Sequence, residues 1–367
     1  MPADARILAV NPGSTSTKFG LFVNDVPVLV KTVRHEADEL APFRGRPILD
    51  QGDFRASRIE SALVAAGHSV QELSAVVGRG GLLRPLPSGT YLVTDTMLDE
   101  LRRAERGEHA SNLGAFLASG MASRSGAPAY VVDPVSVDEW PARARLSGTP
   151  LLTRPCLSHA LNTKAVAKRY AREVGRPYPS LRLVVVHAGS GISVSAHEGG
   201  RMVDVTNSRE EGAFSTERAG GVPAMALVDL CFSGKVTRKE VETLLFREGG
   251  LEAYLGTKDL QEVERRIAAG DALAAAVFDA MSYQIAKEIG AMATVLSGRV
   301  DAILLTGGMA HSEGLRSSLS SAVAWIAEVR AYPGEDELLA LAEGALRVLR
   351  GDESARVLDG EAGGARA

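Results

Sequence analysis

The chain has 367 residues, enough for two domains, and its formal net charge is -4 with 23% charged and 45% hydrophobic residues. A nearly balanced charge and only 5% aromatic residues argue against a nucleic-acid-binding protein, which needs basic surface and stacking side chains. The two cysteines, Cys156 and Cys231, form no CxxC pair, which favours a reducing compartment and neither disulfides nor a cysteine-bound metal.

Neither a membrane helix nor a secretory signal is predicted. No uninterrupted apolar run approaches the roughly 20 residues that span a bilayer. The N-terminal "MPADARILAV" is also shorter in apolar residues than a signal peptide. We therefore expect a soluble, cytoplasmic protein with no membrane partner.

The first half of the chain opens with predicted strands at 6–10, 18–23 and 26–33, joined by "NPGSTST" and by the turn "ND". This pattern is typical of a β-meander. Three segments with helical spacing follow, and "APAYVVDPV" reads as a strand that ends at Asp133-Pro134.

The second half begins with a predicted helix in "HALNTKAVAKRYAREVG" and then repeats the meander in "LRLVVVHAGSGISVSAHEGGRMVDVTN". A long helical stretch precedes "VDAILLTGGMAHSEG", a strand leading into a glycine pair. "DELLALAEGALRVLRG" is a predicted terminal helix, and residues 352–367 are expected to form a disordered tail.

An internal repeat links the two halves. Superposing "AVNPGSTSTKFGLF" on "VVHAGSGISVSAH" places Asn11 against His187, Gly13 against Gly189 and Ser14 against Ser190. "AVVGRGGLL" and "AILLTGGMA" match in the same order, each a strand followed by a polar residue and Gly-Gly. Two matching pairs in the same order predict a duplicated domain.

The two Gly/Ser/Thr turns are candidate phosphate-binding loops, because they offer unobstructed backbone N–H groups and hydroxyl donors. Lys18, close behind the first turn, adds a point charge. One such hairpin alone is more often a plain polar turn, but two in corresponding places favour a nucleotide triphosphate site. "CFSGKV" lacks the P-loop spacing and "GSGISV" lacks the third glycine of a dinucleotide fingerprint.

Arg79 is the most informative charged residue, because it follows an apolar strand directly and precedes Gly-Gly, which predicts a position at a strand end facing a cleft. Arg218 in "FSTERAGG" and the acidic run in "YPGEDE" also lie beside glycines. The histidines His109, His159 and His187 lack metal-ligand spacing and are interpreted as hydrogen-bonding groups.

The motifs taken together resemble a known family. "ILAVNPGSTSTKFGLF", "VGRGGLLRP", "GEHASNLGA", "VVDPVSVDE", "FSTERAG", "ILLTGGMA" and "YPGEDELLALAEGALRVLRG", in this order, are similar to the butyrate kinases of the acetokinase family, in the sugar kinase/Hsp70/actin-like superfamily. The resemblance extends over nearly all of residues 6–351.

The resemblance implies reversible phosphorylation of butanoate by ATP, giving butanoyl phosphate and ADP, with Mg²⁺. It implies an α/β protein of two duplicated actin-like (ribonuclease H-like) domains with a nucleotide cleft between them, assembled as a homodimer or larger homo-oligomer. The expected division is 1–153, completed by the helix 338–351, as domain I and 154–337 as domain II, with 352–367 as the tail.

Site residues are carried over by matching motifs. The catalytic candidates are Arg79, Arg218, Asp133, His159 and His187. The nucleotide-binding candidates are Asn11, Gly13, Ser14, Thr15, Ser16 and Lys18 in the first loop, Gly189, Ser190 and Gly191 in the second, and Gly307 and Gly308 beside the adenosine. Glu335 and Asp336 in "GEDE" are both candidates for holding Mg²⁺, and the match does not choose between them.

The chain also departs from the family pattern. "HAGSG" replaces the usual H-L-G-G-G, "STERAGG" replaces S-P-E-R-A-G, "SREEGAF" is one residue shorter, and Leu157-Ser158 stands where Ile-Phe is common. These changes leave both arginines intact but leave the acid's chain length open, with propionate or isobutyrate as alternatives. A nucleotide-binding actin-like protein without turnover is a second reading. A sugar kinase is a third, although paired arginines suit an acid better than a hydroxyl.

Overall fold

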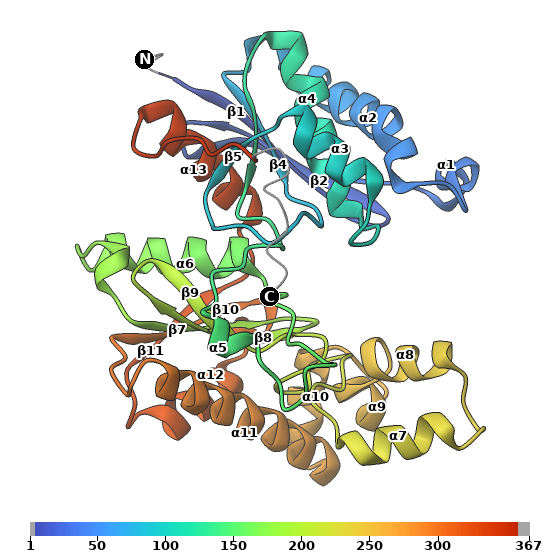
Figure 1. Ribbon diagram of the computed structural model, residues 1–367, viewed down its shortest axis with the longest axis vertical. Helices are drawn as coiled ribbons and strands as arrows, with labels where there is room; N and C mark the ends of the chain where they lie inside the picture. The colour runs from blue at the N-terminus through green and yellow to red at the C-terminus, as the bar shows by residue number, and fades with distance from the viewer. Residues whose placement is uncertain (1–3, 359–367) are drawn as a thin grey trace. The chain divides into compact units, whose positions relative to one another are not determined.

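The computed structural model describes residues 4–358, which form two compact units (Figure 1). The first unit contains the described residues up to Asp138 and from Asp336 onward, and the second contains Glu139–Glu335. Each unit is built around one mixed β-sheet.

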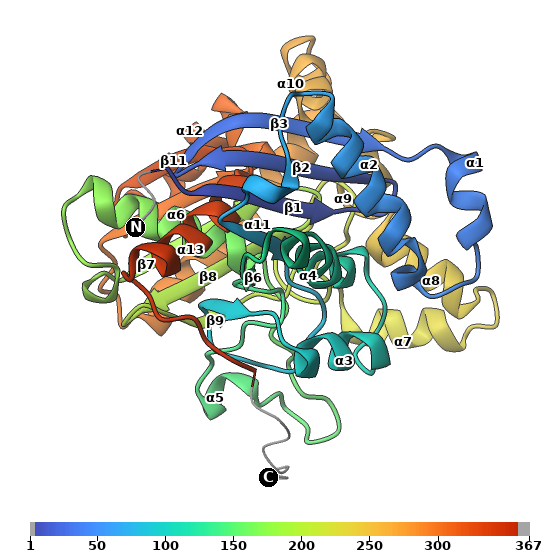
Figure 2. The same ribbon diagram turned by 90° about the horizontal axis from the view of Figure 1, so that it is seen from above.

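The first sheet has the strand order β3-β2-β1-β4-β6-β5. Figure 2 shows β3, β2 and β1 side by side. The strands β1, β2 and β3 form an antiparallel meander, β4 and β6 continue parallel to β1, and β5 closes the edge antiparallel to β6. Their bounds are β1 Arg6–Pro12, β2 Ser16–Val23, β3 Val26–Arg34, β4 Ala75–Arg79, β5 Thr90–Leu92 and β6 Ala129–Val132.

Helices cover both faces of the first sheet, with α4 and α13 on opposite sides (Figure 1). Leu8 and Val10 of β1 pack with Leu113 and Leu117 of α4, because alternate strand residues point to the same face. The helix bounds are α1 Ala37–Leu40, α2 Gly52–Val64, α3 Asp95–Arg103, α4 Leu113–Ser125 and α13 Glu337–Arg350.

The second sheet has the order β11-β10-β7-β8-β9. Here β7, β8 and β9 form the antiparallel meander, and β10 and β11 continue parallel to β7. Their bounds are β7 Leu183–Ala188, β8 Ile192–Glu198, β9 Arg201–Val205, β10 Ala302–Gly307 and β11 Val329–Pro333.

Alternating β7 residues divide the second core into two layers. Val184 and Val186 pack with α11 and α12, whereas Leu183 and Val185 pack with α6 on the other face (Figure 1). The helix bounds are α5 Ala142–Arg145, α6 Ala160–Glu173, α7 Ala224–Phe232, α8 Arg238–Phe246, α9 Gly250–Leu255, α10 Leu260–Ala268, α11 Ala272–Val295 and α12 Glu313–Val323. Within residues 4–358, no helix has the length and apolar character needed to cross a bilayer.

The predicted duplication is confirmed by the two strand orders. In each sheet the first strand of the meander is central, its hairpin partners lie on one side, and parallel strands continue on the other. Thus β1 corresponds to β7 and β4 to β10. Asn11 pairs with Lys18 across the first hairpin, and His187 pairs with Ser193 across the second.

The units divide at 138–139 and 335–336, earlier than the expected 153–154 and 337–338. The segment 139–153 belongs to the second unit because its side chains form ion pairs, hydrogen bonds and a cation–π contact with residues of that unit. The Glu139 carboxylate lies 2.6 Å from the buried Lys164 ammonium and accepts a hydrogen bond from the Met202 N–H. The ring of Trp140 lies under the Arg154 guanidinium, 4.7 Å away.

The tail prediction does not hold for residues 352–358. Arg356 exchanges backbone hydrogen bonds with Thr90 and Leu92 of β5, and Leu358 is buried. The Glu353 carboxylate accepts hydrogen bonds from the Thr90 N–H and from Arg347. Residues 359–367 of the predicted tail lie outside the described residues.

Candidate active site

The first predicted phosphate loop is the turn between β1 and β2. It is closed by a hydrogen bond of 2.8 Å from the Gly13 N–H to the Ser16 carbonyl. Ser14 and Thr15 at its tip are exposed, and neither of their N–H groups donates to another group within residues 4–358. The loop therefore offers two adjacent backbone donors to solvent, an arrangement that suits an anion.

The second predicted phosphate loop is the turn between β7 and β8. The Gly189 N–H donates to the Gly191 carbonyl over 3.1 Å, and the Ser190 carbonyl accepts a hydrogen bond of 2.6 Å from the Ser215 hydroxyl. Gly307, at the end of β10, has φ 93° and passes directly beside the loop. A Cβ at Gly307 would lie 2.3 Å from the Ala188 carbonyl oxygen, so only glycine fits there.

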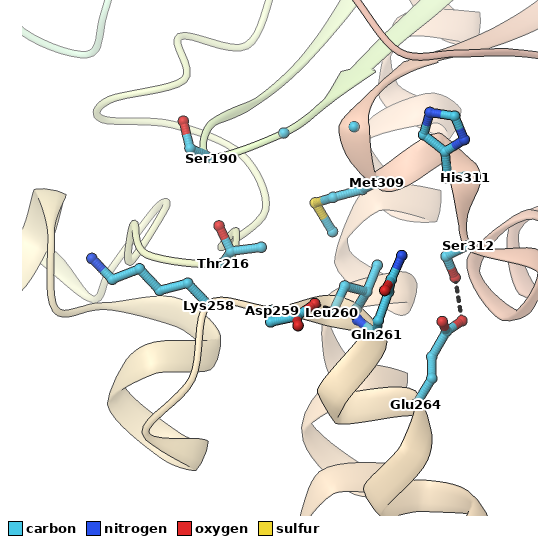
Figure 3. Close-up of a pocket in the computed structure, with 12 residues that line it drawn as sticks. Ser190, Thr216, Lys258, Asp259, Leu260, Gln261, Glu264, Met309, His311 and Ser312 are labelled. Carbon is cyan, nitrogen blue, oxygen red and sulfur yellow. Dashed lines mark hydrogen bonds between the residues drawn. The ribbon is translucent and has the colours of Figure 1, made fainter. Parts of the chain in front are cut away.

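A cavity of about 320 Å³ opens beside the second loop (Figure 3). Its walls include Gly189 and Ser190 of the loop and Gly308 after β10, three residues predicted for nucleotide binding. Met309 and Gln261 point toward one another across it in Figure 3. The volume lies at the lower end of the range for small-molecule sites, which suits a nucleoside.

Sequence reasoning missed the far wall of this cavity. It is formed by the segment leading into α10 and by the turn after β10, and it includes Lys258, Asp259, Gln261, Glu264, His311 and Ser312. The Ser312 hydroxyl donates to the Glu264 carboxylate over 2.5 Å. No glycine pattern marks these side chains, and they come from two distant parts of the sequence.

Arg218 lies against the second loop. A Cβ at Gly191 would come within 2.5 Å of Arg218 Nη1, so the glycine allows the guanidinium its position. Nη1 donates to the carbonyl and hydroxyl oxygens of Ser208, and Nε and Nη2 make no hydrogen bond to residues 4–358. Burial lowers the pKa of Arg218, yet the group stays charged at neutral pH. One edge of the guanidinium can therefore receive an oxyanion.

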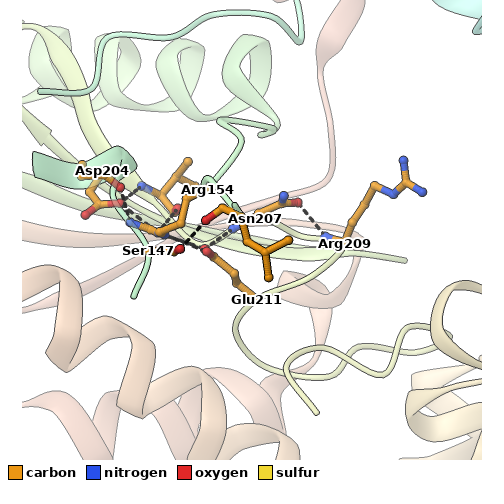
Figure 4. Close-up of polar contacts among 9 residues, drawn as sticks. Ser147, Arg154, Asp204, Asn207, Arg209 and Glu211 are labelled. Carbon is orange, nitrogen blue, oxygen red and sulfur yellow. Dashed lines mark hydrogen bonds and ion pairs between the residues drawn. The ribbon is translucent and has the colours of Figure 1, made fainter. Parts of the chain in front are cut away.

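The loop that carries Ser208 is braced by a polar network (Figure 4). Arg154 pairs with both carboxylate oxygens of Glu211, at 2.7 and 2.9 Å, and with Asp204 at 3.3 Å. Glu211 in turn accepts a hydrogen bond from the Asn207 N–H, and the Asn207 side chain accepts one from the Arg209 N–H. The "SREEGAF" segment, which also contacts Arg218 through Ser208, is thus joined to β9 by Arg154, which pairs with both Glu211 and Asp204.

His159 and His187 stack face to face, with ring centroids 3.8 Å apart and an interplanar angle of 10°. His187, at the end of β7, is buried; its Nδ1 lies 2.9 Å from Asn162 Oδ1 and its Nε2 lies 3.1 Å from Glu335 Oε1. His159 Nδ1 lies 3.1 Å from the Ser193 hydroxyl. The structure thus brings together two predicted histidines and one predicted metal ligand of the second unit.

In the first unit, Arg79 at the end of β4 meets Asn11 of β1 and Glu337 at the start of α13. Arg79 Nη1 lies 3.1 Å from Glu337 Oε2 and 3.4 Å from Asn11 Oδ1, and the Asn11 amide donates to Glu337. Glu337 is the last residue of the "GEDE" run, but it was not one of the two named Mg²⁺ candidates, Glu335 and Asp336. Asp336 is exposed at the N-cap of α13, so the three acidic residues take three different surroundings.

Asp133 and Arg79 follow neighbouring parallel strands and therefore lie at the same edge of the first sheet. Asp133 has φ 38°, is buried, and accepts a hydrogen bond of 2.7 Å from the Gly89 N–H. His109 belongs to this neighbourhood as well: burial, and then the charge of Arg79, lower its pKa. Its Nδ1 lies 2.8 Å from the Ser111 hydroxyl, in keeping with a hydrogen-bonding role.

The predicted residues thus separate into two groups. Asn11, Arg79, Asp133 and Lys18 with the loop 13–16 lie in the first unit, where Lys18 pairs with Asn11 across the hairpin. His159, His187, Gly189–Gly191, Arg218, Gly307, Gly308 and Glu335 lie in the second. Within residues 4–358, no cluster of three or more His, Cys, Asp or Glu could hold a metal by itself.

Residues 152–324 match the family model of the acetokinase family. Among solved structures, the chain is similar to the acetate kinase of Porphyromonas gingivalis, with a TM-score of 0.78 and 18% identity over 94% of this chain and 100% of that one. The acetate kinase of Entamoeba histolytica gives 0.75 and 16%, over 93% and 98%. A propionate kinase from Francisella tularensis gives 0.70 and 17%, over 93% and 98%. The similarity over both units confirms the predicted two-domain actin-like fold.

Proposed function

We propose that this chain is a carboxylate kinase of the acetokinase family that transfers the terminal phosphoryl group of ATP to butanoate, reversibly. One observation carries the proposal: each unit of the duplicated fold has an arginine near a candidate phosphate loop. Arg218 lies beside the loop 189–191 in the second unit, and Arg79 lies at the end of β4 in the first. The match of residues 152–324 to the acetokinase model supports the same reaction class.

The chemistry asks little of a general base, since a carboxylate is already a nucleophile at neutral pH. The difficulty is bringing two anions together, so positioning and charge neutralisation dominate phosphoryl transfer. Arg218 offers its Nε–Nη2 edge to an oxyanion while Ser208 fixes the rest of the group. Arg79, steadied by Asn11 and Glu337, orients the acid or the migrating phosphoryl group. A guanidinium suits both because its donors match carboxylate and phosphate oxygens.

Magnesium would bind through Glu337 and Asn11 together with nucleotide oxygens. The donor set fits, because Mg²⁺ prefers hard oxygen ligands and commonly takes only one or two protein groups beside phosphates. Glu337 is a better candidate than Glu335, whose carboxylate lies against His187, or than the exposed Asp336. When bound, the ion would neutralise charge on the phosphate oxygens.

The nucleoside is assigned to the cavity beside the second loop, where Gly308 and Met309 form one wall. His159 and His187 lie at the base of that loop. We assign His159 to hydrogen bonding with phosphate or acid oxygens, and His187, whose ring nitrogens lie against Asn162 and Glu335, to holding the His159 ring in place by stacking. Asp133 is assigned to the neighbourhood of the nucleophile. The choice of butanoate comes from the resemblance, because propionate and isobutyrate differ from butanoate only in apolar surface.

A homodimer or larger homo-oligomer is proposed from the resemblance and is supported by α7. Most of its nine residues are apolar, and none is buried, with Phe232 87% and Met225 71% exposed. Contiguous apolar surface of this kind marks an interaction site more often than free surface. We expect light scattering after size exclusion to give more than one chain per particle, and Phe232→Asp to shift the mass toward one chain.

The assay that tests the function traps acyl phosphate with hydroxylamine, using purified protein, ATP and Mg²⁺. Butanoate, isobutyrate, propionate and acetate are compared side by side. We expect product, with the highest kcat/KM for a four-carbon acid. A faster reaction with propionate or acetate would reassign the substrate within the same reaction class. ATP binding without product from any acid would favour the nucleotide-binding reading and reject the kinase.

A further inference from the structure

Arg55 of α2 lies directly behind the first phosphate loop and is fully buried. Its Nη1 donates to the Gly13 carbonyl over 2.7 Å and to the Ser16 carbonyl over 3.0 Å, and its Nη2 donates to the Ser14 carbonyl over 3.0 Å. One guanidinium therefore holds three of the four carbonyl oxygens of residues 13–16.

The fourth carbonyl, that of Thr15, accepts a hydrogen bond of 2.9 Å from the His35 N–H. All four carbonyl oxygens are thus engaged by the body of the first unit. In a trans peptide the carbonyl and the following N–H point in opposite directions. Holding the carbonyls of Gly13 and Ser14 inward therefore aims the N–H groups of Ser14 and Thr15 outward, where an anion would meet them.

The charge of Arg55 has no counterion in the described part of the chain. Its other contacts are neutral: the Gln51 amide oxygen accepts from Nε and Nη2, at 3.0 and 2.8 Å, and the Thr17 hydroxyl lies 3.1 Å from Nη1. Burial lowers the pKa of Arg55 to about 10, so it stays protonated at neutral pH. Because buried charges are normally paired, an unpaired one behind a loop of exposed N–H groups points to an anionic ligand.

We infer that Arg55 is a positioning residue for nucleotide binding, which orients the first loop and whose charge is balanced by a phosphate group held on the other side of that loop. The inference rests on the proposed function for the identity of the anion as a nucleotide phosphate. It assigns to α2 a role that the loop sequence alone does not reveal, since Arg55 lies about forty positions away from it.

Gln51→Glu separates this role from a merely structural one. The new carboxylate keeps both hydrogen bonds with Arg55 but neutralises its charge, so the melting temperature should stay unchanged or rise. Calorimetric titration should show Kd for Mg·ATP about tenfold higher, as expected when a close charge is compensated in a partly buried site. Kd for adenosine, which lacks phosphates, should not change. Gln71→Glu, at an exposed position of the same unit, adds equal charge and should leave both constants unchanged.

Variants of Arg55 itself complete the test. Arg55→Lys keeps the charge with fewer donors and should retain more ATP affinity than Arg55→Gln, each measured below its own melting temperature. Arg58→Ala is the matched control, because Arg58 lies on the same helix but is half exposed and pairs with Glu39. If both Arg55 variants fail to fold, the Kd for Mg·ATP of the Gln51→Glu variant alone tests whether the charge of Arg55 contributes to nucleotide binding.

The outcomes distinguish the inference from the proposed function. Unchanged or tighter ATP binding in Gln51→Glu, with an active wild-type enzyme, overturns the role of Arg55 and leaves the kinase intact. Equal loss of ATP and adenosine affinity also overturns it, because such a loss reports general disturbance of the fold. A wild-type protein that binds no ATP overturns both.

Discussion

Replacing Arg79 with alanine is expected to lower kcat by about two powers of ten or more, the scale seen when a preorganised charge donor is removed. Arg79 lies at the carboxyl end of β4 with its Nη1 between Asn11 Oδ1 and Glu337 Oε2. Its loss removes positive charge from the place assigned to the acid and the migrating phosphoryl group. It also removes one of the two groups that hydrogen-bond to the Glu337 carboxylate, the other being the Asn11 amide, and so disturbs the residue that we assign to Mg²⁺.

The measurement is steady-state acyl phosphate formation by the Arg79→Ala enzyme at saturating ATP and varied acid, alongside its melting temperature. Arg102→Ala is a suitable control, since Arg102 is exposed and its contacts are an ion pair with its helix neighbour Asp99 and a cation–π contact with the Phe116 ring. We expect kcat to fall while the melting temperature changes little, because the Arg79 side chain is partly exposed. Near-normal turnover of a folded Arg79→Ala enzyme would remove Arg79 from the reaction.

Much of the fold could be predicted from short sequence patterns, because the two duplicated hairpins carry polar turn residues at corresponding positions. Asn11 and His187 occupy the same place in β1 and β7, as the repeat predicted. The placement of Arg79 after an apolar strand and before Gly-Gly was enough to predict its position at a strand end. Local sequence carries this information because strand alternation and turn chemistry are local properties.

The sequence could not show which acidic residue of the "GEDE" run would bind Mg²⁺, because the direction of each side chain depends on the backbone conformation of the turn before α13. Gly334 has φ 90° and pairs with Gly307, after which the chain enters α13. Glu335 therefore faces His187 in one unit, whereas Glu337 faces Asn11 and Arg79 in the other. The three adjacent acidic residues are equivalent in the sequence. The turn at Gly334 and the start of α13 give their carboxylates different surroundings.

Contacts between residues far apart in the sequence were the other feature of the structure that sequence patterns did not predict. Arg55 looks like one more charged residue of an amphipathic helix, yet it is buried and bonded to the loop at 13–16. The early boundary at 138–139 depends in the same way on the pair Glu139–Lys164. Neither partner is marked by spacing, because the pairs form only after the chain has folded.

Replacing Arg218 with lysine is expected to cost nearly as much activity as replacing it with alanine. Nη1 of the guanidinium is occupied by the carbonyl and hydroxyl oxygens of Ser208, and the Nε–Nη2 edge is left for an oxyanion. A lysine ammonium has one centre of charge and cannot satisfy Ser208 and also present two parallel donors. We expect both variants to lose about a hundredfold in kcat, the scale of a misplaced reacting group.

The comparison needs kcat and KM for ATP and acid in Arg218→Lys, Arg218→Ala and Ser208→Ala. Ser208→Ala should have a much smaller effect, because it removes the hydroxyl acceptor but keeps the carbonyl that also binds Nη1. Free guanidinium added to Arg218→Ala should restore part of kcat, because the space beside Gly191 that the side chain filled is then open. Full activity in Arg218→Lys would show that charge alone suffices at this position. The fork geometry fixed by Ser208 and Gly191 would then be a property of the fold and not of the reaction.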